Sequence, residues 1–445
     1  MIKKLQQKLK KDANLKELLS GSALTFVIKI TGMLIGYVVV LLVSRKYGAE
    51  GTGIYSLTTS ILNSLAILGG LGLNISVLRY VGQFNKTENG FANMKKLYNY
   101  ILQLALPFSI FIGLGLFFMA DKIALDILEN PTYIPALKVG SVALPFFTLN
   151  LINVEFIRGL KLLKVSEYLR SINTPLIVVI IMVLSVLSYG ILDAVYAMVV
   201  GIIVSFFLSM VYIGKYFKNH NAKGIKADFS KKELVKTSMP MMTIAVASFV
   251  MANGGVFFLE MYSTTDQVGI FNVCLRLAQL VSLVLVVVNT IAAPKFAELY
   301  WAGKREELQK VINQSSKIIF FVSLMISVVL IFTSNLALGL FGQEFTSGNF
   351  ALVILIFAQM INAMTGSVGV FLNMSGHQKI LRNIILVSAS LVVMGYILIV
   401  PHYGIFGAAL VGLLGSLLLN ISAAIYVYRT LGIITFYQPK FIQHE

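Results

Sequence analysis

Long apolar runs recur along this whole chain, and they constrain its fold more than any other feature. Each is long enough to cross about 30 Å of hydrocarbon as an α-helix. Six lie at 20–43, 54–78, 98–120, 136–157, 171–190 and 194–214, and six more at 238–262, 268–292, 318–340, 350–374, 383–400 and 405–428. Only 12% of the residues are charged and the mean hydropathy is +0.84, whereas soluble domains are roughly 25% charged. The sequence therefore predicts an all-α integral membrane protein with twelve transmembrane helices.

Most basic residues fall on one side of the predicted membrane. With a cytoplasmic N-terminus, the inner segments hold 30 of the 36 Lys and Arg residues, and the outer segments hold only Arg45, Lys46, Lys122 and Lys138. This is the positive-inside distribution, and it predicts a multi-pass protein with both termini in the cytoplasm. The net charge of +17 then requires no nucleic acid as a partner, because the basic loops would face anionic membrane lipids.

Glycine-rich landmarks occur twice in the chain, in the same order. Gly53 and Gly269 are 216 residues apart, Gly159 and Gly376 are 217 apart, and Tyr189-Gly190-Ile191 precedes Tyr403-Gly404-Ile405 by 214. A duplicated unit of six helices explains this spacing, although chance matching of glycine-rich turns is the alternative. Because six is even, both copies keep the same topology, which predicts two pseudo-twofold-related six-helix lobes around a central cavity.

This organisation predicts five segments. They are a basic cytoplasmic segment at 1–19, an N-lobe at 20–214, a cytoplasmic linker at 215–237, a C-lobe at 238–428 and a cytoplasmic tail at 429–445. The first apolar run is too long for a signal peptide, so an uncleaved first helix is expected.

Lys29 lies near the middle of the first apolar run, where a charge is costly unless it faces a polar cavity. Ser22, Thr25, Lys29, Gly32 and Gly36 are spaced by three or four residues, which places hydroxyls, a cation and small residues on one helical face. Such a face is suited to a substrate path. The alternative is that Lys29 extends its stem toward the nearer interface.

A second cation, Arg276, lies in the eighth apolar run and shares a helical face with Asn272 and Gln279. Its planar guanidinium can donate two parallel hydrogen bonds to the oxygens of one phosphate. There are two alternatives for Arg276: its side chain extends to the outer headgroups, or it pairs with Glu260 at the end of the seventh run. Glu260 is also the candidate for binding a coupling ion.

Amide side chains form two further stripes at helical spacing. Gln359, Asn362 and Asn373 lie in the tenth run, and Asn63 and Asn74 lie in the second. They are candidates for a polar cavity lining that contacts sugar hydroxyls. In membranes, amides also hold helices together, so a structural role is the alternative for each.

The chain lacks the patterns that enzymes use. Its four histidines are scattered and its one cysteine, Cys274, lies within a predicted helix, so neither a metal site nor a catalytic triad emerges. A Walker lysine pattern is also missing. We therefore predict no catalytic residues, no metal and no cofactor, and a transporter driven by an ion gradient, the membrane potential or its substrate's own gradient.

Several landmarks together resemble the bacterial polysaccharide repeat-unit flippases of the O-antigen type. These belong to the polysaccharide transporter family of the multidrug/oligosaccharidyl-lipid/polysaccharide exporter superfamily. The resemblance rests on Gly51-Thr52-Gly53-Ile54-Tyr55, on Gly70-Leu71-Gly72-Leu73-Asn74, on Leu78-Arg79-Tyr80-Val81, and on the run from Tyr403 to Ala409 followed by Asn420. Their order over essentially the whole chain carries the match, since no single motif is specific.

The resemblance implies a substrate and a place. The substrate would be an undecaprenyl-diphosphate-linked oligosaccharide, moved from the inner to the outer leaflet of the bacterial cytoplasmic membrane for O-antigen, lipopolysaccharide or capsule biosynthesis. Lys29 and Arg276 would bind the diphosphate, and membrane lipids, a polysaccharide polymerase and a chain-length regulator would be partners. The competing functions are a multidrug or organic-cation exporter of the same superfamily, a flippase for the peptidoglycan precursor, and a membrane glycan polymerase, which would need a large outer loop.

Overall fold

The computed structural model describes residues 13–85, 89–184, 189–219 and 228–437, but not the side chains of residues 13–26 and Asn219. These ranges contain helices and turns and no strand. Ten of their helices are long and apolar enough to cross a membrane. Two of the ten, Val27–Gly69 and Gln378–Leu431, each contain a non-helical glycine. Dividing both at that residue gives the twelve spans predicted from the apolar runs, so the chain is a multi-pass membrane protein.

The two dividing glycines reverse the chain between successive spans. Gly48 has φ 67° and ψ −165°, and Gly404 has φ 50° and ψ −130°. Residues with a Cβ atom rarely adopt positive φ, and glycine adopts it without steric cost. Short turns of this kind follow from the sequence, which leaves only a few polar residues between the apolar runs on either side of each glycine.

The chain divides into two compact units. Unit 1 comprises residues 1–43 and 57–246, and unit 2 comprises residues 44–56 and 247–445. The short segment around Gly48 therefore packs with the second half of the chain. The division later falls within a continuous helix, α9 (Lys231–Tyr262).

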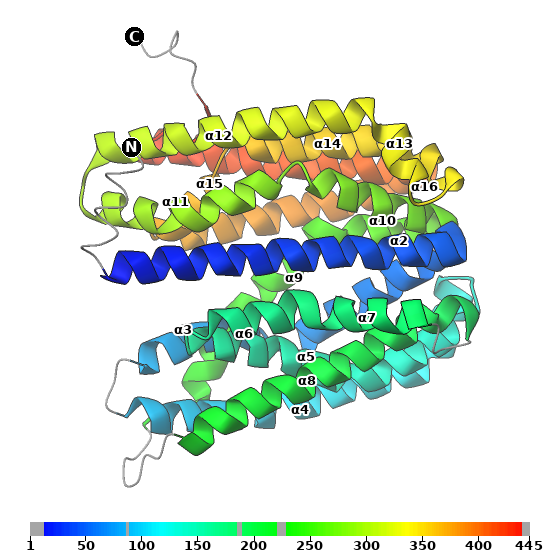
Figure 1. The fold of residues 1–445 in the computed structure, drawn as a ribbon, viewed down its shortest axis with the longest axis horizontal. Coiled ribbons are helices and arrows are strands. Elements are labelled where there is room, and N and C mark those ends of the chain that lie inside the picture. Colours follow the sequence, from blue (N-terminus) through cyan, green and yellow to red (C-terminus); the bar gives the residue numbers. More distant parts are fainter. Residues whose placement is uncertain (1–12, 86–88, 185–188, 220–227, 438–445) are drawn as a thin grey trace. The chain divides into compact units, whose positions relative to one another are not determined.

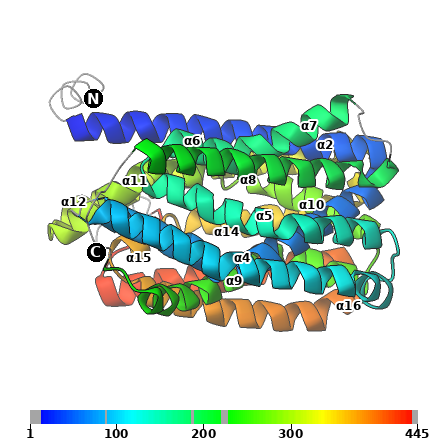
Figure 2. The ribbon, with the colours of Figure 1, turned by 90° about the horizontal axis from the view of Figure 1, so that it is seen from below.

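Unit 1 is built around α5, which packs against α3, α4 and α8. Figure 2 shows α4, α5 and α8 as long neighbouring helices. The elements of the unit are most of α2 (Ala13–Gly69), α3 (Leu73–Phe84), α4 (Gly90–Lys122), η1 (Ile123–Ile127), α5 (Tyr133–Gly159), α6 (Leu163–Glu167), η2 (Tyr168–Ile172), α7 (Asn173–Leu184), η3 (Gly190–Leu192), α8 (Asp193–Asn219) and the beginning of α9.

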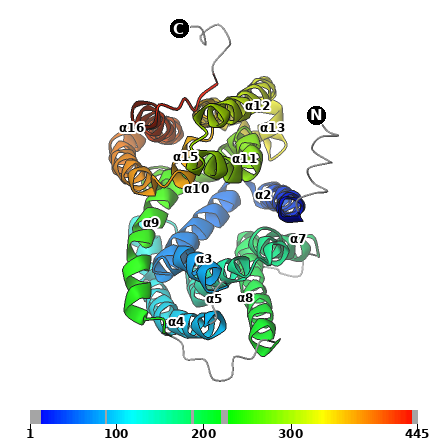
Figure 3. The same cartoon turned by 90° about the vertical axis from the view of Figure 1, so that its left-hand side faces the viewer.

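Unit 2 has α14 at its centre, in contact with α10, α12 and α16. Figure 1 shows α12 and α14 side by side, and Figure 3 shows the helices of this unit from their ends. Its elements are the end of α9, α10 (Thr265–Gln279), α11 (Leu283–Trp301), α12 (Arg305–Phe332), α13 (Ser334–Gly339), η4 (Gln343–Gly348), α14 (Asn349–Met364), α15 (Val368–Met374), α16 (Gln378–Tyr426) and η5 (Val427–Leu431).

Four of the predicted continuous helices are wrong, because each is interrupted. The run 54–78 breaks between Gly69 and Leu73, the run 268–292 breaks between Gln279 and Leu283, and the run 350–374 breaks between Met364 and Val368. The run 318–340 also breaks, at Thr333 between α12 and α13. At the first and third breaks a glycine with positive φ stands next to another backbone segment. A Cβ atom at Gly72 (φ +71°) would lie 2.6 Å from the Met242 backbone nitrogen, and one at Gly366 (φ +67°) would lie 2.5 Å from the Thr435 oxygen. Hydropathy does not report such approaches, since all four breaks lie inside the predicted apolar runs.

Each unit has its own apolar core, and the core of unit 1 contains a chain of hydrogen-bonded polar side chains. In unit 1 the Tyr98 ring packs edge-on against Phe156, with centroids 5.4 Å apart. The Tyr98 hydroxyl donates to Asn153 Oδ1 at 3.0 Å, and Asn153 Nδ2 donates to Ser209 Oγ at 2.9 Å. This buried chain links α4, α5 and α8, and hydrogen bonds of this kind offset the cost of burying polar groups.

Candidate functional site

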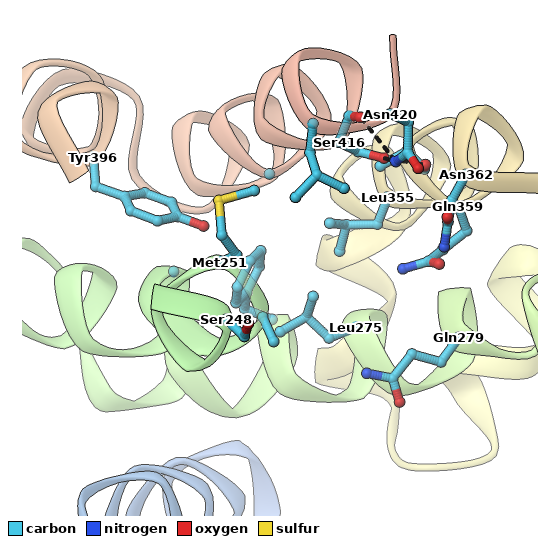
Figure 4. Close-up of a pocket in the computed structure, with 16 residues that line it drawn as sticks. Ser248, Met251, Leu275, Gln279, Leu355, Gln359, Asn362, Tyr396, Ser416 and Asn420 are labelled. Atoms are coloured by element: carbon cyan, nitrogen blue, oxygen red, sulfur yellow. Dashed lines mark hydrogen bonds between the residues drawn. The ribbon is translucent and has the colours of Figure 1, made fainter. Parts of the chain in front are cut away.

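A polar pocket in unit 2 is the candidate functional site. It encloses about 260 Å³ between α9, α10, α14 and α16, and Figure 4 shows the side chains that surround it. Its polar side chains come from all four helices. They are Ser248, Gln279, Gln359, Asn362, Tyr396, Ser416 and Asn420.

Three amides of this pocket have no hydrogen-bond partner among the described residues. Gln279 comes from the end of α10, and Gln359 and Asn362 lie one turn apart on α14. Within the part of the chain that the structure describes, none of their side chains makes a hydrogen bond, and all three are at least partly accessible. Figure 4 shows Gln279 and Gln359 on different helices bordering the same space. A primary amide both donates and accepts hydrogen bonds, so these groups are available to a polar ligand.

Other polar residues hold the wall of the pocket in place. Ser416 Oγ donates to the Ala358 carbonyl oxygen at 2.9 Å, which ties α16 to α14. Asn420 Nδ2 donates to the Ser416 carbonyl oxygen at 2.9 Å and contacts Ser416 Oγ at 3.3 Å. The backbone that carries Gln359 is therefore anchored directly beside it.

The aromatic rings of Tyr396 and Phe271 border the other end of the pocket. Behind the pocket, Tyr396 stacks on Phe258, with centroids 5.3 Å apart and planes at 20°. Glycines on α9 make room for the rings: a Cβ atom at Gly254 would lie 2.8 Å from Tyr396 Cε2, and one at Gly255 would lie 2.7 Å from Phe271 Cε1. The pocket thus combines amides with apolar ring surface. None of its described lining residues is charged.

Arg276 contacts its predicted neighbour but does not line this pocket. Its Nε donates to Asn272 Oδ1 at 3.0 Å, and both side chains are half-buried. Glu260 is 4% exposed, and its Oε1 accepts a hydrogen bond from Thr265 Oγ1 at 2.9 Å. The phosphate and ion roles of these residues stay predictions.

Lys29 lies in unit 1 on α2, half-buried, and has no hydrogen-bond or ion-pair partner among the described residues. The predicted Ser22 and Thr25 side chains next to it lie outside the described residues. An unpaired cation within a membrane-spanning helix is expected to face polar surroundings or extend to an interface.

The remaining predicted amides are dispersed by the helix breaks. Asn63 lies on α2 and donates to the Thr59 carbonyl oxygen at 2.9 Å, whereas Asn74 lies beyond the break on α3, and its buried Oδ1 has no partner among the described residues. The prediction that they share one face of one helix is wrong. Asn373 is separated in the same way, because it lies on α15 and is exposed.

Four polar residues line the pocket although no pattern in the sequence predicted them there: Ser248, Tyr396, Ser416 and Asn420. One signal was present for Ser416, which lies four residues before Asn420 in an otherwise apolar stretch. Among the residues that the structure describes, no three His, Cys, Asp or Glu side chains gather as a metal site would require.

The fold resembles solved transporters over nearly its whole length. A lipid II flippase MurJ in an inward closed conformation matches with TM-score 0.72 and 16% identity, covering 92% of this chain and 87% of that one. An inward-facing multidrug resistance MATE family transporter of the MOP superfamily matches with TM-score 0.69 and 13% identity, covering 92% and 98%. The MATE multidrug transporter DinF-BH matches with TM-score 0.68 and 18% identity, covering 96% and 98%. At such identities the likeness establishes the fold alone.

The family follows from the sequence match. No protein of curated function matches the chain. The model of one family, described as polysaccharide biosynthesis protein, matches residues 18–300, which is more than half of the sequence. The chain, which has the fold of MOP-superfamily transporters, belongs to the polysaccharide biosynthesis protein family.

Proposed function

We propose that this protein is a flippase that moves an undecaprenyl-diphosphate-linked oligosaccharide from the inner to the outer leaflet of the bacterial cytoplasmic membrane. The observation that carries the proposal is the uncharged amide pocket of unit 2. Its three uncommitted amides match the alternating donors and acceptors of sugar hydroxyls, and its rings match the apolar faces of sugars. The family supports a role in surface polysaccharide synthesis, of which O-antigen and capsule are the expected types.

The transport problem explains why such groups belong in a membrane protein. A diphosphate and its sugars lose their hydration inside hydrocarbon, and unpaired polar groups cost several kcal/mol each there. Amides replace water around the hydroxyls, and Lys29 is available to the diphosphate. Arg276, held by Asn272, is the second candidate for this contact. Alternating access would then expose the site to one leaflet at a time.

Two related functions share the fold. Multidrug export is favoured by the MATE likeness, but organic cations are usually bound by carboxylates, and the described lining of the pocket contains none. A lipid II flippase is among the similar structures, and its substrate also joins a lipid diphosphate to sugars. We place the peptidoglycan precursor second to a polysaccharide repeat unit because the matching family is that of polysaccharide biosynthesis.

Deleting the protein from its host separates these functions. Lipid-linked oligosaccharide is measured on each leaflet with a membrane-impermeant glycan-labelling enzyme, alongside surface polysaccharide and dye efflux. We expect repeat units to accumulate on the cytoplasmic leaflet while the surface polymer disappears. Unchanged surface glycan with reduced efflux of cationic dyes would instead establish a drug exporter.

A further inference from the structure

A second cavity in unit 2 is apolar and differs in kind from the amide pocket. It encloses about 620 Å³ between α12, the end of α14, the last part of α16, η5 and the segment that follows η5. Phe320, Ile421, Ile425 and Phe436 contribute to its wall, which shares no residue with the lining of the amide pocket. The volume lies within the range of ligand-binding cavities.

The wall formed by the last described segment of the chain is fixed by paired hydrogen bonds. Gln309 Nε2 donates to the Ile434 carbonyl oxygen at 2.7 Å, and the Ile434 backbone nitrogen donates to Gln309 Oε1 at 3.0 Å. Ser316 Oγ donates to the Thr435 carbonyl oxygen. The Tyr437 ring then stacks on Phe320, with centroids 5.9 Å apart. This segment is held along α12 as a defined side of the cavity.

Two cations lie where the cavity reaches the edge of the apolar sequence. On α12, Lys317 directly precedes the apolar run that starts at Ile318, and it lies one turn before Phe320. In η5, which follows α16, Arg429 comes directly after Tyr428 of the cavity wall. Both cations are exposed, and neither has an ion-pair or hydrogen-bond partner in the described ranges.

We propose that this cavity binds one anionic phospholipid of the surrounding membrane. An acyl chain would occupy the apolar space, and the headgroup phosphate would lie between Lys317 and Arg429. The positions of the two cations in the sequence support this arrangement. Each lies at the end of an apolar run, and the cavity residues Phe320, Ile421 and Ile425 lie inside these runs. Phosphate forms charge-assisted hydrogen bonds with Lys and Arg, and anionic lipids are attracted to such basic residues. The occupant is a resident lipid and is independent of the proposed transport substrate.

Native mass spectrometry of the purified full-length protein tests this site. The protein in detergent is titrated with phosphatidylglycerol or phosphatidylcholine, and the fraction carrying one lipid is measured. We expect phosphatidylglycerol to bind about tenfold more tightly, and K317A/R429A to remove that preference, as expected for the loss of charge-assisted contacts. Lys310→Ala is the matched control, because Lys310 is an exposed lysine on the same helix, outside the apolar run, with no ion-pair or hydrogen-bond partner in the described ranges.

A second variant tests the cavity independently of charge. Ala424→Trp places an indole in the wall of the cavity, and it should reduce binding of both lipids, whereas Leu391→Trp on the exposed first half of α16 should not. Equal binding of the two lipids, or normal phosphatidylglycerol binding in A424W, would overturn the proposal. A several-fold increase in lipid binding after removal of residues 438–445 would also overturn it, in favour of the chain's own C-terminal end as the occupant.

Discussion

Gln359 is one of three amide residues around the unit 2 pocket whose side chains lack hydrogen-bond partners within the described ranges. Helical spacing in the sequence was enough to propose Gln279, Gln359 and Asn362 as polar lining, and the structure brings these three together. Their role as substrate contacts stays a prediction. Tyr396 could not be predicted, since it reaches the pocket only because Gly254 and Gly255 on a distant helix leave room for it and for Phe271.

Replacing two of these amides should weaken transport without unfolding the protein. A neutral hydrogen bond contributes about 0.5–1.5 kcal/mol, so the loss of two such bonds in Q359A/N362A is expected to lower the initial rate of flipping at low substrate by about 5- to 150-fold. The rate is measured in proteoliposomes with a lipid-linked oligosaccharide. The matched control is Asn373→Ala, an exposed amide outside the pocket. Equal rates for the double variant and the control would exclude the pocket from substrate binding.

Lys29 allows the contribution of charge to be tested separately. If it binds the diphosphate, Lys29→Ala should reduce surface polysaccharide about tenfold or more, because hydrogen bonds to charged groups contribute about 1.5–3 kcal/mol. Lys29→Arg should retain most of the activity, since it keeps the cation. Surface glycan and the amount of membrane-inserted protein are measured together. Normal glycan in the alanine variant would leave snorkelling to the interface as the role of Lys29.

At the scale of elements, hydropathy located the spans but not their interruptions. The turns at Gly48 and Gly404 lie between apolar runs and were visible in the sequence. The breaks at Gly72 and Gly366 lie inside apolar runs, and they depend on backbone from α9 and from the segment after η5. Because those neighbours are remote in sequence, a local pattern could not report them. The same breaks explain why the predicted amide stripes were only partly correct.

The break at Gly72 should be sensitive to one added methyl group. Gly72→Ala imposes a positive φ on a residue with a Cβ atom, which costs about 1–2 kcal/mol, and it also forces the Cβ atom against Met242. We expect the midpoint temperature of thermal aggregation to fall by several degrees. Fluorescence-detected size-exclusion chromatography measures this midpoint. Gly82→Ala is the control, because a Cβ atom there meets nothing within 4 Å and alanine favours helix more than glycine does. An unchanged midpoint in G72A would mean that the backbone between Gly69 and Leu73 adjusts to the added methyl group without loss of stability.

At the scale of the whole molecule, composition was decisive. Apolar runs spaced along 445 residues leave few folds other than a helical membrane bundle, and the family match and the similar structures agree with it. The substrate could not be read at this scale, because lipid II flippases and multidrug transporters share the architecture. What distinguishes them is the chemistry of a few side chains.

The predicted orientation is also a property of the whole chain. Cys274 is fully buried and is the only cysteine, so the protein has little background reactivity toward thiol reagents. A membrane-impermeant maleimide added to intact spheroplasts should label Lys122→Cys on the outer side and leave Lys304→Cys unlabelled until the membrane is opened. Both positions are exposed. The reverse labelling order would place the termini outside the cytoplasm.

The repeated glycine landmarks also contact each other. A Cβ atom added at Gly269 would lie 2.9 Å from the Gly53 backbone nitrogen, so two positions 216 residues apart in the repeat meet in one packing contact. If the two halves arose by duplication of one six-helix unit, the same contact would have linked equivalent residues of two identical chains. Self-complementary contacts of this type hold together twofold-symmetric dimers. On that prediction, a six-helix ancestor would have worked as a homodimer, with one glycine per subunit near its symmetry axis.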